Sequence, residues 1–306
     1  MKHLKPFSYF ISGIILSSLL FGVVAFNDIN EDEERVDVMP DGRLQYKWYA
    51  PQAPKTMNFA GEKVPLERWD IEEALERELL YNYYNQYHTL YILRLASRYF
   101  PVIEPILKAN GVPLDFKYLC IAESALRNQT SRAGAVGFWQ FMPGTAPEYG
   151  LEINNDVDER YDVEKSTVAA CKYFLQAYNR FGSWTAVAAS YNMGQGGFNS
   201  RKTSQHQTNY YDLMLPEETM RYVYRILAFK LLIGEAEQFG YIVNGKDAYQ
   251  PIPVKTITVT HTIPDLVDFA INHGTTYKML KTLNPWLRSD NLSNASGKTY
   301  IIKLSL

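Results

Sequence analysis

The 306-residue sequence contains few of the residues that form disulfides or bind metals. It has only two cysteines, Cys120 and Cys171, and both fall in segments with helical patterns. Free buried thiols are the default interpretation, and a disulfide between them stays open if the protein is exported. The five histidines show no metal-ligand spacing with each other or with the cysteines. We therefore expect neither a metal site nor a cofactor.

The sequence also lacks an excess of charge of one sign. Its formal net charge is −2, which gives no argument for a nucleic-acid partner or for an acidic membrane surface. Hydrophobic residues make up 46% and charged residues 21%, as in a globular chain with an ample core. The length allows one large domain, or a medium domain with a small appendage. No oligomeric state is predicted.

Charge is absent from most of the first 26 residues, where an apolar run follows Lys2 and Lys5. This pattern predicts an export signal, either a removed signal peptide or an uncleaved membrane anchor. No cysteine follows the run, which argues against a lipoprotein anchor. Residues 27–67 contain an acidic cluster and several prolines, and we expect an irregular linker there.

Strand-like alternation is missing between residues 70 and 240, so residues 68–245 are expected to form a mainly α domain. Apolar residues recur there at helical spacing, and glycines and prolines mark the ends of the segments. The expected helices cover 71–100, a short segment containing Pro101 and Pro105, 119–126, 145–150, 166–181, 184–191 and 217–234.

The pattern changes after Gly245. Residues 256–260 are β-branched and indicate a strand, and residues 300–302 indicate a closing strand. Between them, 266–273 and 275–283 have the patterns of two short helices. We therefore expect a small βααβ module over residues 252–306, present once because nothing in the chain repeats.

One stretch, residues 119–151, combines chemistry with packing signals. Glu123 is the one carboxylate among Leu119, Cys120, Ile121 and Ala122, at the margin of an apolar helix face. Loss of hydration there raises the pKa of a carboxyl group, because the charged form is disfavoured. A carboxyl that keeps its proton near neutral pH can deliver it to a leaving group. Glu123 is therefore the candidate general acid.

The same stretch continues with polar and aromatic residues around a run of small ones. Ser131 precedes small residues at 133–137, where backbone can approach a ligand or another helix closely. Gln140 follows, between Trp139 and Phe141, and its amide can both donate and accept hydrogen bonds. We expect the two aromatic residues to lie in the core. Downstream, Asp158, Arg160 and Asp162 are expected to form a structural cap or ion pair.

These residues carry a resemblance to a known family. The run of Glu123, Ser131, Gln140 and the small residues between them resembles the signature of goose-type-lysozyme-like (SLT) lytic transglycosylases, which cleave peptidoglycan glycan strands. Residues 189–194 and 215–223 match later segments of that family in the same order. The resemblance covers about residues 75–245 and implies a lysozyme-like helical domain.

The C-terminal βααβ pattern resembles a LysM module, a divergent one. It departs from the family pattern at Ile263-Pro264-Asp265, where the family usually has Gly-Asp-Thr. Glycan binding by this module is therefore in question, while its fold is expected to survive.

The resemblance implies roles for individual residues. Glu123 would protonate the glycosidic oxygen between N-acetylmuramic acid and N-acetylglucosamine, and would then take the proton of the muramic C6 hydroxyl as it attacks C1. The product would be a 1,6-anhydro end. The resemblance also implies a substrate-binding set, for each member of which ordinary capping or packing is the alternative: Ser131, Gln140, Tyr191, Asn192, Glu218 and Tyr222.

Two other functions stay open. A hydrolase that uses water would need a second carboxylate, and none follows Glu123 in the stretch before Glu148. A catalytically silent cell-wall-binding scaffold would have no need of an acid in an apolar setting. The expected partner is peptidoglycan. The expected location is the bacterial cell envelope (periplasm), with attachment to the membrane if the N-terminal segment is kept.

Overall fold

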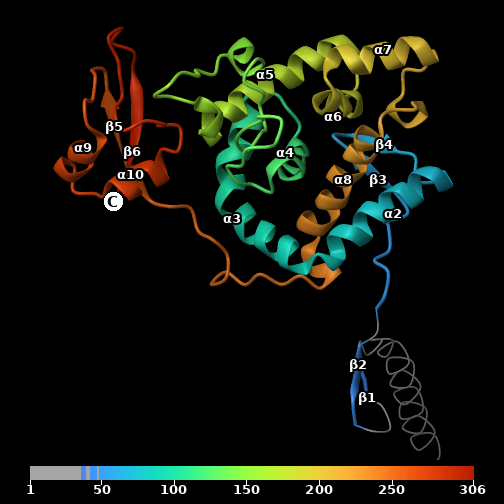
Figure 1. Ribbon diagram of the computed structural model, residues 1–306. Coiled ribbons are helices and arrows are strands. Elements are labelled where there is room, and N and C mark those ends of the chain that lie inside the picture. Colours follow the sequence, from blue (N-terminus) through green and yellow to red (C-terminus); the bar gives the residue numbers. More distant parts are fainter. Residues whose placement is uncertain (1–35, 39–41, 47) are drawn as a thin grey trace, which may run out of the picture. The chain divides into compact units, whose positions relative to one another are not determined.

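The computed structural model describes residues 36–38, 42–46 and 48–306 (Figure 1), so the predicted signal peptide or anchor lies outside the described residues. Residues 1–50 and 51–306 are separate compact units. In the first unit, β1 (Val36–Val38) pairs with β2 (Leu44–Tyr46) in an antiparallel hairpin. Over the described ranges, no helix has the length and apolarity needed to cross a membrane.

The second unit begins with another hairpin, so the expectation of an irregular linker up to residue 67 is wrong for this part of the chain. Strand β3 (Met57–Phe59) pairs with β4 (Glu62–Val64). The two residues between them, Ala60 and Gly61, both have positive φ, as a tight two-residue hairpin turn requires. Phe59 is fully buried in the helical core, which fixes the hairpin in place.

Helices form the rest of this part, and the predicted mainly α class is confirmed. Apolar residues at helical spacing bury one face of each helix, which explains why the periodic segments fold as predicted. The elements, in chain order, are α2 (Trp69–Tyr84), α3 (Gln86–Ala109), α4 (Phe116–Ser124), η1 (Ala146–Tyr149), η2 (Glu159–Tyr161), α5 (Val163–Phe181), α6 (Trp184–Met193), α7 (Gln195–Gln205), η3 (Tyr210–Asp212), α8 (Glu217–Gly234) and η4 (Ala236–Phe239).

The first predicted helices have the wrong boundaries. The chain breaks after Tyr84, and α3 then continues through Pro101 and Pro105 instead of stopping before them. Both prolines are exposed, so water can solvate the carbonyls whose helical bonds they remove. Ile103 and Leu107 on the opposite face are fully buried, and their packing outweighs the cost of the prolines.

Helix α8 is central to the arrangement. It packs against α2, α4 and α6, and Figure 1 shows it running beside α2. Helix α8 therefore contacts two helices with predicted site residues, because α4 carries Glu123 and the last turn of α6 carries Tyr191 and Asn192.

The C-terminal segment folds as the predicted βααβ module. Strand β5 (Val254–Val259) pairs with β6 (Tyr300–Ser305) in antiparallel register, with α9 (Leu266–Asn272) and α10 (Tyr277–Leu283) between them. The module has its own hydrophobic core, separate from that of the helices.

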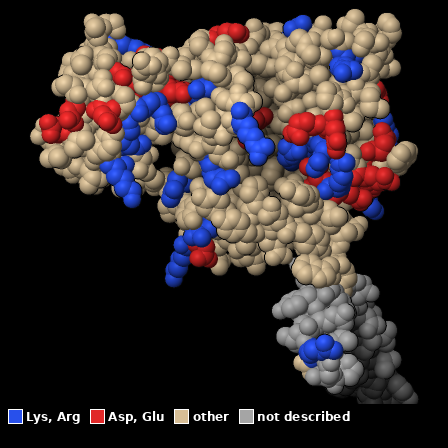
Figure 2. All heavy atoms as spheres, in the orientation of Figure 1, with Lys and Arg blue, Asp and Glu red and all other residues tan. Residues whose placement is uncertain are grey.

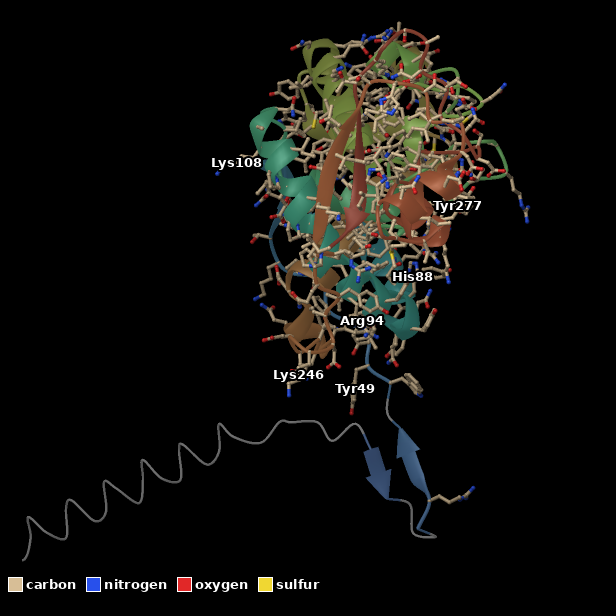
Figure 3. All side chains as sticks on the ribbon, turned by 90° about the vertical axis from the view of Figure 1, so that its left-hand side faces the viewer. Tyr49, His88, Arg94, Lys108, Lys246 and Tyr277 are labelled. Carbon is tan, nitrogen blue, oxygen red and sulfur yellow. The ribbon has the colours of Figure 1, made fainter. Side chains whose placement is uncertain are left out.

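The chain that leads into this module is fastened to α3. Arg94, labelled in Figure 3, donates from Nε to the carbonyl of Asp247 at 2.6 Å, and its guanidinium carbon lies 4.3 Å from the centre of the Tyr249 ring. Arg98, one turn further on, donates to the carbonyl of Gln250 at 3.0 Å. The connector is therefore held along its length.

The β3–β4 hairpin also caps a helix that carries site residues. The Glu62 carboxylate accepts hydrogen bonds from the amides of Trp184 (2.5 Å) and Thr185 (3.0 Å) and from the hydroxyls of Ser183 (2.9 Å) and Thr185 (2.7 Å). These amides are the free donors at the start of α6, where a negative charge also interacts favourably with the helix dipole. Glu62 thus stabilises the helix whose last turn carries Tyr191 and Asn192.

Replacing this carboxylate should destabilise the domain. We expect Glu62→Ala to lower the free energy of unfolding by about 1–2 kcal/mol, because the start of α6 loses its charged acceptor. Glu67→Ala is the matched control, since Glu67 forms an exposed ion pair with Lys63 four residues away and should change stability by less than about 0.5 kcal/mol. Urea unfolding followed by circular dichroism measures both. Equal effects of the two substitutions would contradict the capping role.

Candidate functional site

Glu123 lies on the last turn of α4, with a buried apolar face behind it. Leu119, Cys120 and Ile121 are buried, whereas Glu123 itself is partly exposed. The helix ends one residue after the glutamate. The carboxyl therefore lies at the C-terminal end of a helix whose neighbouring residues are buried and apolar, and not on a solvated helix face.

The chain leaves α4 through a strained turn. Ala125 (φ 53°) and Leu126 (φ 56°) both adopt the left-handed conformation, and both are buried. Such residues pay about 1 kcal/mol each when they are not glycine. Their apolar side chains enter the core, and this packing holds the turn. The turn directs the chain sharply away from the helix immediately behind Glu123.

The closest partner of the Glu123 carboxyl is a tyrosine of α8. The hydroxyl of Tyr222 donates a hydrogen bond to Glu123 Oε1, and the tyrosine side chain is 2% exposed. Burial raises the pKa of the Glu123 carboxyl from 4.5 to about 7. The Tyr222 hydrogen bond and the positive charge of Arg225 lower the pKa, and the negative charge of Glu218 raises it, so burial is the dominant effect.

Arg225 is held in this position by carboxylates on two helices. Its guanidinium lies 3.5 Å from Glu78 of α2 and 3.0 Å from Glu218 of α8. Glu78 is 1% exposed and also accepts from Arg221 at 2.6 Å, so it is a buried charge paired with two arginines. Figure 2 shows acidic and basic side chains intermixed over this region of α2 and α8.

Sequence reasoning missed both Glu78 and Arg225. Glu78 occurs in a segment rich in charged residues, where a single carboxylate looks like part of a solvated helix face. Arg225 could have been found, because it lies three residues after Tyr222 and seven after Glu218, on the same side of one helix.

Tyr191 and Asn192 connect the site to its surroundings through α6. The Tyr191 hydroxyl donates to the carbonyl of Trp139 at 2.6 Å, and Asn192 Oδ1 accepts from the Thr219 hydroxyl at 2.8 Å. Tyr191 is also near enough to Glu123 for the carboxylate to raise the pKa of its phenol, in addition to the larger effect of burial.

Ser131 and Gln140 lie in the irregular loop 128–141, which follows the strained turn. The Ser131 hydroxyl accepts from the amide of Ala135 at 2.9 Å, which closes a turn within the loop. Gln140 has a positive φ of 49°, and its Nε2 donates to the carbonyls of Gly137 (2.7 Å) and Gln129 (3.1 Å). The side chain of Gln129 in turn donates to the carbonyl of Ser124, beside Glu123.

The structure thus brings three of the predicted site residues close to Glu123: Tyr222 by a direct bond, and Tyr191 and Glu218 by their charge interactions with it. The hydrogen bonds of Ser131 lie within its own loop. As predicted, Trp139 and Phe141 belong to the hydrophobic core.

The prediction of a structural ion pair at 158–162 is confirmed. Arg160 donates to both carboxylate oxygens of Asp158, at 2.9 and 2.7 Å, and Asp162 caps the start of α5. Both cysteines are free and buried. Gly137 has a φ of +86°, and a Cβ there would lie 1.9 Å from the carbonyl oxygen of Arg160. Only glycine allows this approach between the loop 128–141 and η2.

Comparisons with known proteins agree with this organisation. Residues 101–214 match the family model described as the transglycosylase SLT domain, and residues 255–305 match the soluble lytic transglycosylase C-terminal LysM-like domain. A membrane-bound lytic murein transglycosylase D, from Escherichia coli strain K12, is 30% identical over 213 residues, which are 68% of this chain and 46% of that enzyme. The order and spacing of the motifs at residues 123–143, 189–194 and 215–223 also resemble those of membrane-bound lytic murein transglycosylase D.

Other similar proteins match shorter parts. A putative tributyltin chloride resistance protein from Alteromonas sp. strain M-1 is 28% identical over 123 residues, covering 37% of this chain and 59% of that protein. The 70 kDa soluble lytic transglycosylase of Escherichia coli matches 58% of this chain and 33% of its own at 19% identity, with a TM-score of 0.41. An inactive mutant of lytic transglycosylase Slt from Pseudomonas aeruginosa matches 50% of this chain and 26% of its own, also at 19% identity, with a TM-score of 0.37. The chain spans about half the length of the transglycosylase D that it matches.

Glu123→Gln should make the protein more stable in alkaline solution. The pKa of the carboxyl is about 7 in the folded chain and 4.5 in its ordinary state. Between these values the folded chain binds more protons than the unfolded chain, so wild-type stability falls as pH rises through this window. Glutamine removes the ionisation, and one pKa unit corresponds to about 1.4 kcal/mol, so the gain at about pH 8 should be at most about 3.5 kcal/mol.

The gain should disappear at about pH 4, where the carboxyl is protonated in both states. Thermal or urea unfolding at the two pH values measures it. Glu218→Gln is the control, because Glu218 is an exposed carboxylate in the same neighbourhood. If Glu123→Gln stabilises equally at both pH values, the ionisation of Glu123 is not the cause.

Proposed function

Because the chain carries a transglycosylase SLT domain and a LysM-like C-terminal domain, we propose that it is a lytic transglycosylase of the bacterial cell wall. Its substrate is the glycan strand of peptidoglycan, and the bond it cleaves joins N-acetylmuramic acid to N-acetylglucosamine. The observation that carries the proposal is the carboxyl of Glu123. It is a partly buried acid whose pKa of about 7 lets it hold a proton near neutral pH.

In this proposal one residue does both proton transfers. Glu123 donates its proton to the glycosidic oxygen as the bond from C1 of the muramic residue breaks, and the acetamido group of the substrate stabilises the cationic centre. Glu123 is then a carboxylate and removes the proton of the C6 hydroxyl, whose oxygen bonds to C1. The 1,6-anhydro end forms without water, and the acid is regenerated.

The environment of Glu123 suits both steps. Burial favours the protonated form that is needed first, while the Tyr222 hydroxyl and the charge of Arg225 stabilise the carboxylate that is produced. A pKa near the working pH makes the group an effective acid and an effective base in turn. The other residues of the site, namely Ser131, Gln140, Tyr191, Asn192 and Glu218, are proposed to bind the sugars on either side of the bond.

The competing function is hydrolysis, and one observation favours it. Glu218 is a second carboxylate close enough to raise the pKa of Glu123, so it is a candidate nucleophile or base. Its ion pair with Arg225 at 3.0 Å counts against this role, because the guanidinium already occupies one oxygen of the carboxylate. The products distinguish the two reactions.

The location of the enzyme is part of the proposal. A peptidoglycan substrate places it in the cell envelope, and the matching transglycosylase D is named as membrane-bound. We propose that residues 1–26 direct export, with residues 68–245 as the catalytic domain and residues 252–306 as the LysM-like module.

Mass spectrometry of the soluble products tests the reaction. We expect digestion of purified peptidoglycan by residues 27–306 to release muropeptides that are one water lighter than hydrolysis products, because C6 replaces water as the nucleophile. Glu123→Gln should release none, because glutamine cannot transfer the proton. Glu218→Gln should still give anhydro ends. If the wild type produces reducing ends and Glu218→Gln produces none, the protein is a hydrolase and not a lytic transglycosylase.

The pH dependence tests the role of Tyr222. Activity needs protonated Glu123, so kcat/KM should fall as pH rises through about 7. Tyr222→Phe removes a hydrogen bond that stabilises the carboxylate, so the pKa should rise and the alkaline limb should move upward by about one unit. Tyr224→Phe, on another face of α8, is the control. Initial rates on soluble glycan strands across the pH range give both profiles, and an unmoved limb would rule out this role.

A further inference from the structure

The C-terminal module contacts the helical part through a short acidic segment of the chain. The carboxylate of Asp156 accepts hydrogen bonds from the Ser289 hydroxyl (2.8 Å), the Asn291 side-chain amide (3.1 Å) and the Ser293 backbone amide (2.9 Å). Its carbonyl accepts from the amide of Arg288 at 2.7 Å. One loop of the module thus surrounds one aspartate of the helical part, and these bonds hold the pKa of that carboxyl below its usual value.

The next residue completes the hydrophobic core of the module. Val157 is 1% exposed and belongs to the module's core, where it forms an isolated β-bridge with Leu287. The amide of Asp158 donates to the carbonyl of Trp286 at 2.8 Å. An apolar side chain from the helical part is therefore part of the module's interior, which a freely tethered module would not contain.

The unusual residues of the module support the same loop. Ile263 stands where LysM modules usually begin Gly-Asp-Thr, and it is buried and exchanges both backbone hydrogen bonds with Leu292, each at 2.9 Å. The amide of Leu266 donates to the carbonyl of Asp290 at 2.8 Å. The departure from the family pattern thus lies directly behind the loop that holds Asp156.

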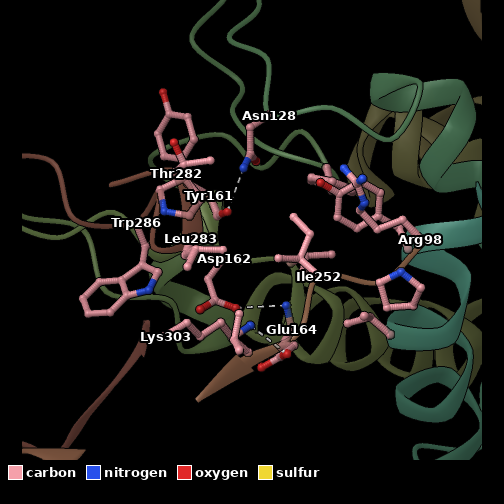
Figure 4. A pocket seen from close by; sticks show the side chains of 17 residues that line it. Arg98, Asn128, Tyr161, Asp162, Glu164, Ile252, Thr282, Leu283, Trp286 and Lys303 are labelled. Carbon is pink, nitrogen blue, oxygen red and sulfur yellow. Dashed lines mark hydrogen bonds and ion pairs between the residues drawn. The ribbon is translucent and has the colours of Figure 1, made fainter. Parts of the chain in front are cut away.

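Ion pairs complete the contact at its rim. Lys298 pairs with Glu152, which also accepts from the Tyr300 hydroxyl at 3.1 Å, and Lys303 pairs with Glu164 at 2.8 Å. Figure 4 shows Glu164 and Lys303 side by side among the residues that line a pocket of about 230 Å³ beside the contact.

From this segment, contacts lead directly into the loop 128–141. Asp158 holds the guanidinium of Arg160, which donates to the carbonyls of Gly134 and Phe141, each at 3.1 Å. The backbone of Arg160 also lies so close to Gly137 that no side chain fits between them. One arginine therefore fastens the loop 128–141 at two points, Gly134 and Phe141.

A second set of contacts runs through Tyr161. The guanidinium carbon of Arg288, in the module, lies 4.0 Å from the centre of the Tyr161 ring. The Tyr161 hydroxyl is 3.1 Å from the hydroxyl of Thr130, and its carbonyl accepts from the side-chain amide of Asn128 at 3.0 Å. Figure 4 shows Asn128 and Tyr161 linked by this bond at the edge of the pocket. Thr130 immediately precedes Ser131.

We propose that the LysM-like module is a structural brace for the substrate-binding loop, and that Asp156 is the positioning residue at its centre. The module holds residues 152–161, and these residues hold the loop that carries Ser131 and Gln140. Cleavage of a short soluble glycan therefore depends on the module, whether or not the module binds the wall. The kinetic test of this inference rests on the proposed function, because it measures cleavage of glycan. The structural test does not rest on it.

The kinetic test uses Asp156→Ala in the full chain, with soluble glycan strands as substrate. We expect kcat/KM to fall about tenfold, mainly through a higher KM, because the loop that binds the sugars loses its fixed position. Asp156→Asn keeps an acceptor for Ser289 and should recover part of the loss. Asp268→Ala is the matched control on the exposed start of α9, and should stay within about twofold of wild type.

The structural test is amide hydrogen exchange, which needs no activity. Asp156→Ala should speed exchange at residues 128–141 as well as at the module, whereas Asp268→Ala should leave the loop unchanged. If Asp156→Ala does not fold, Arg288→Ala is the milder substitution, because it removes the ring contact with Tyr161 and one hydrogen bond to the carbonyl of Pro285 but keeps Asp156. Unchanged exchange in the loop, or an unchanged kcat/KM on soluble strands with loss on intact sacculi alone, would overturn the brace. An inactive wild type whose loop exchange still responds to Asp156 would refute the proposed function and keep the brace.

Discussion

The site depends on keeping the Glu123 carboxyl out of water while it can still be reached from one side. Complete burial would hold it protonated and useless as a base, and full exposure would leave it ionised at neutral pH. At the end of α4 the carboxyl is only partly exposed. The apolar residues of the helix cover one side of it, and the helix ends one residue later. The strained residues Ala125 and Leu126 are part of this arrangement, because their left-handed conformation ends the helix directly after Glu123 and Ser124.

This balance places demands on elements far away in the sequence. Arg225 moderates the pKa of Glu123, and its own position is set by the buried carboxylate of Glu78 on α2. A buried carboxylate is costly unless it is paired, so α2 and α8 must stay in register for both charges to be satisfied. Replacing Glu78 alone would remove the buried ion-pair partner of both Arg221 and Arg225.

Much of this organisation could be predicted from the sequence, because the patterns that predict it lie within single short segments of the chain. Helical periodicity located α5, α6 and α8 within a few residues, because each buries one apolar stripe. The position of Glu123 followed from its apolar neighbours. Trp139 lies in the core as predicted, although it belongs to the irregular loop 128–141 and not to a helix. The continuation of α3 through Pro101 was missed, since the packing that overrides a proline is tertiary.

The contacts that could not be predicted join segments distant in the chain, and they show how much of the chain the candidate site depends on. The family match ends at residue 214, before α8 supplies Tyr222 and Arg225. It begins after the hairpin whose Glu62 caps α6, and it excludes the module whose loop surrounds Asp156. Each of these outer elements positions one part of the site. Helix α8 contacts Glu123, the hairpin caps the helix that carries Tyr191, and the module holds the loop that carries Gln140. A chain cut to the matched residues alone would keep the acid and lose the groups that set its pKa and position its surroundings.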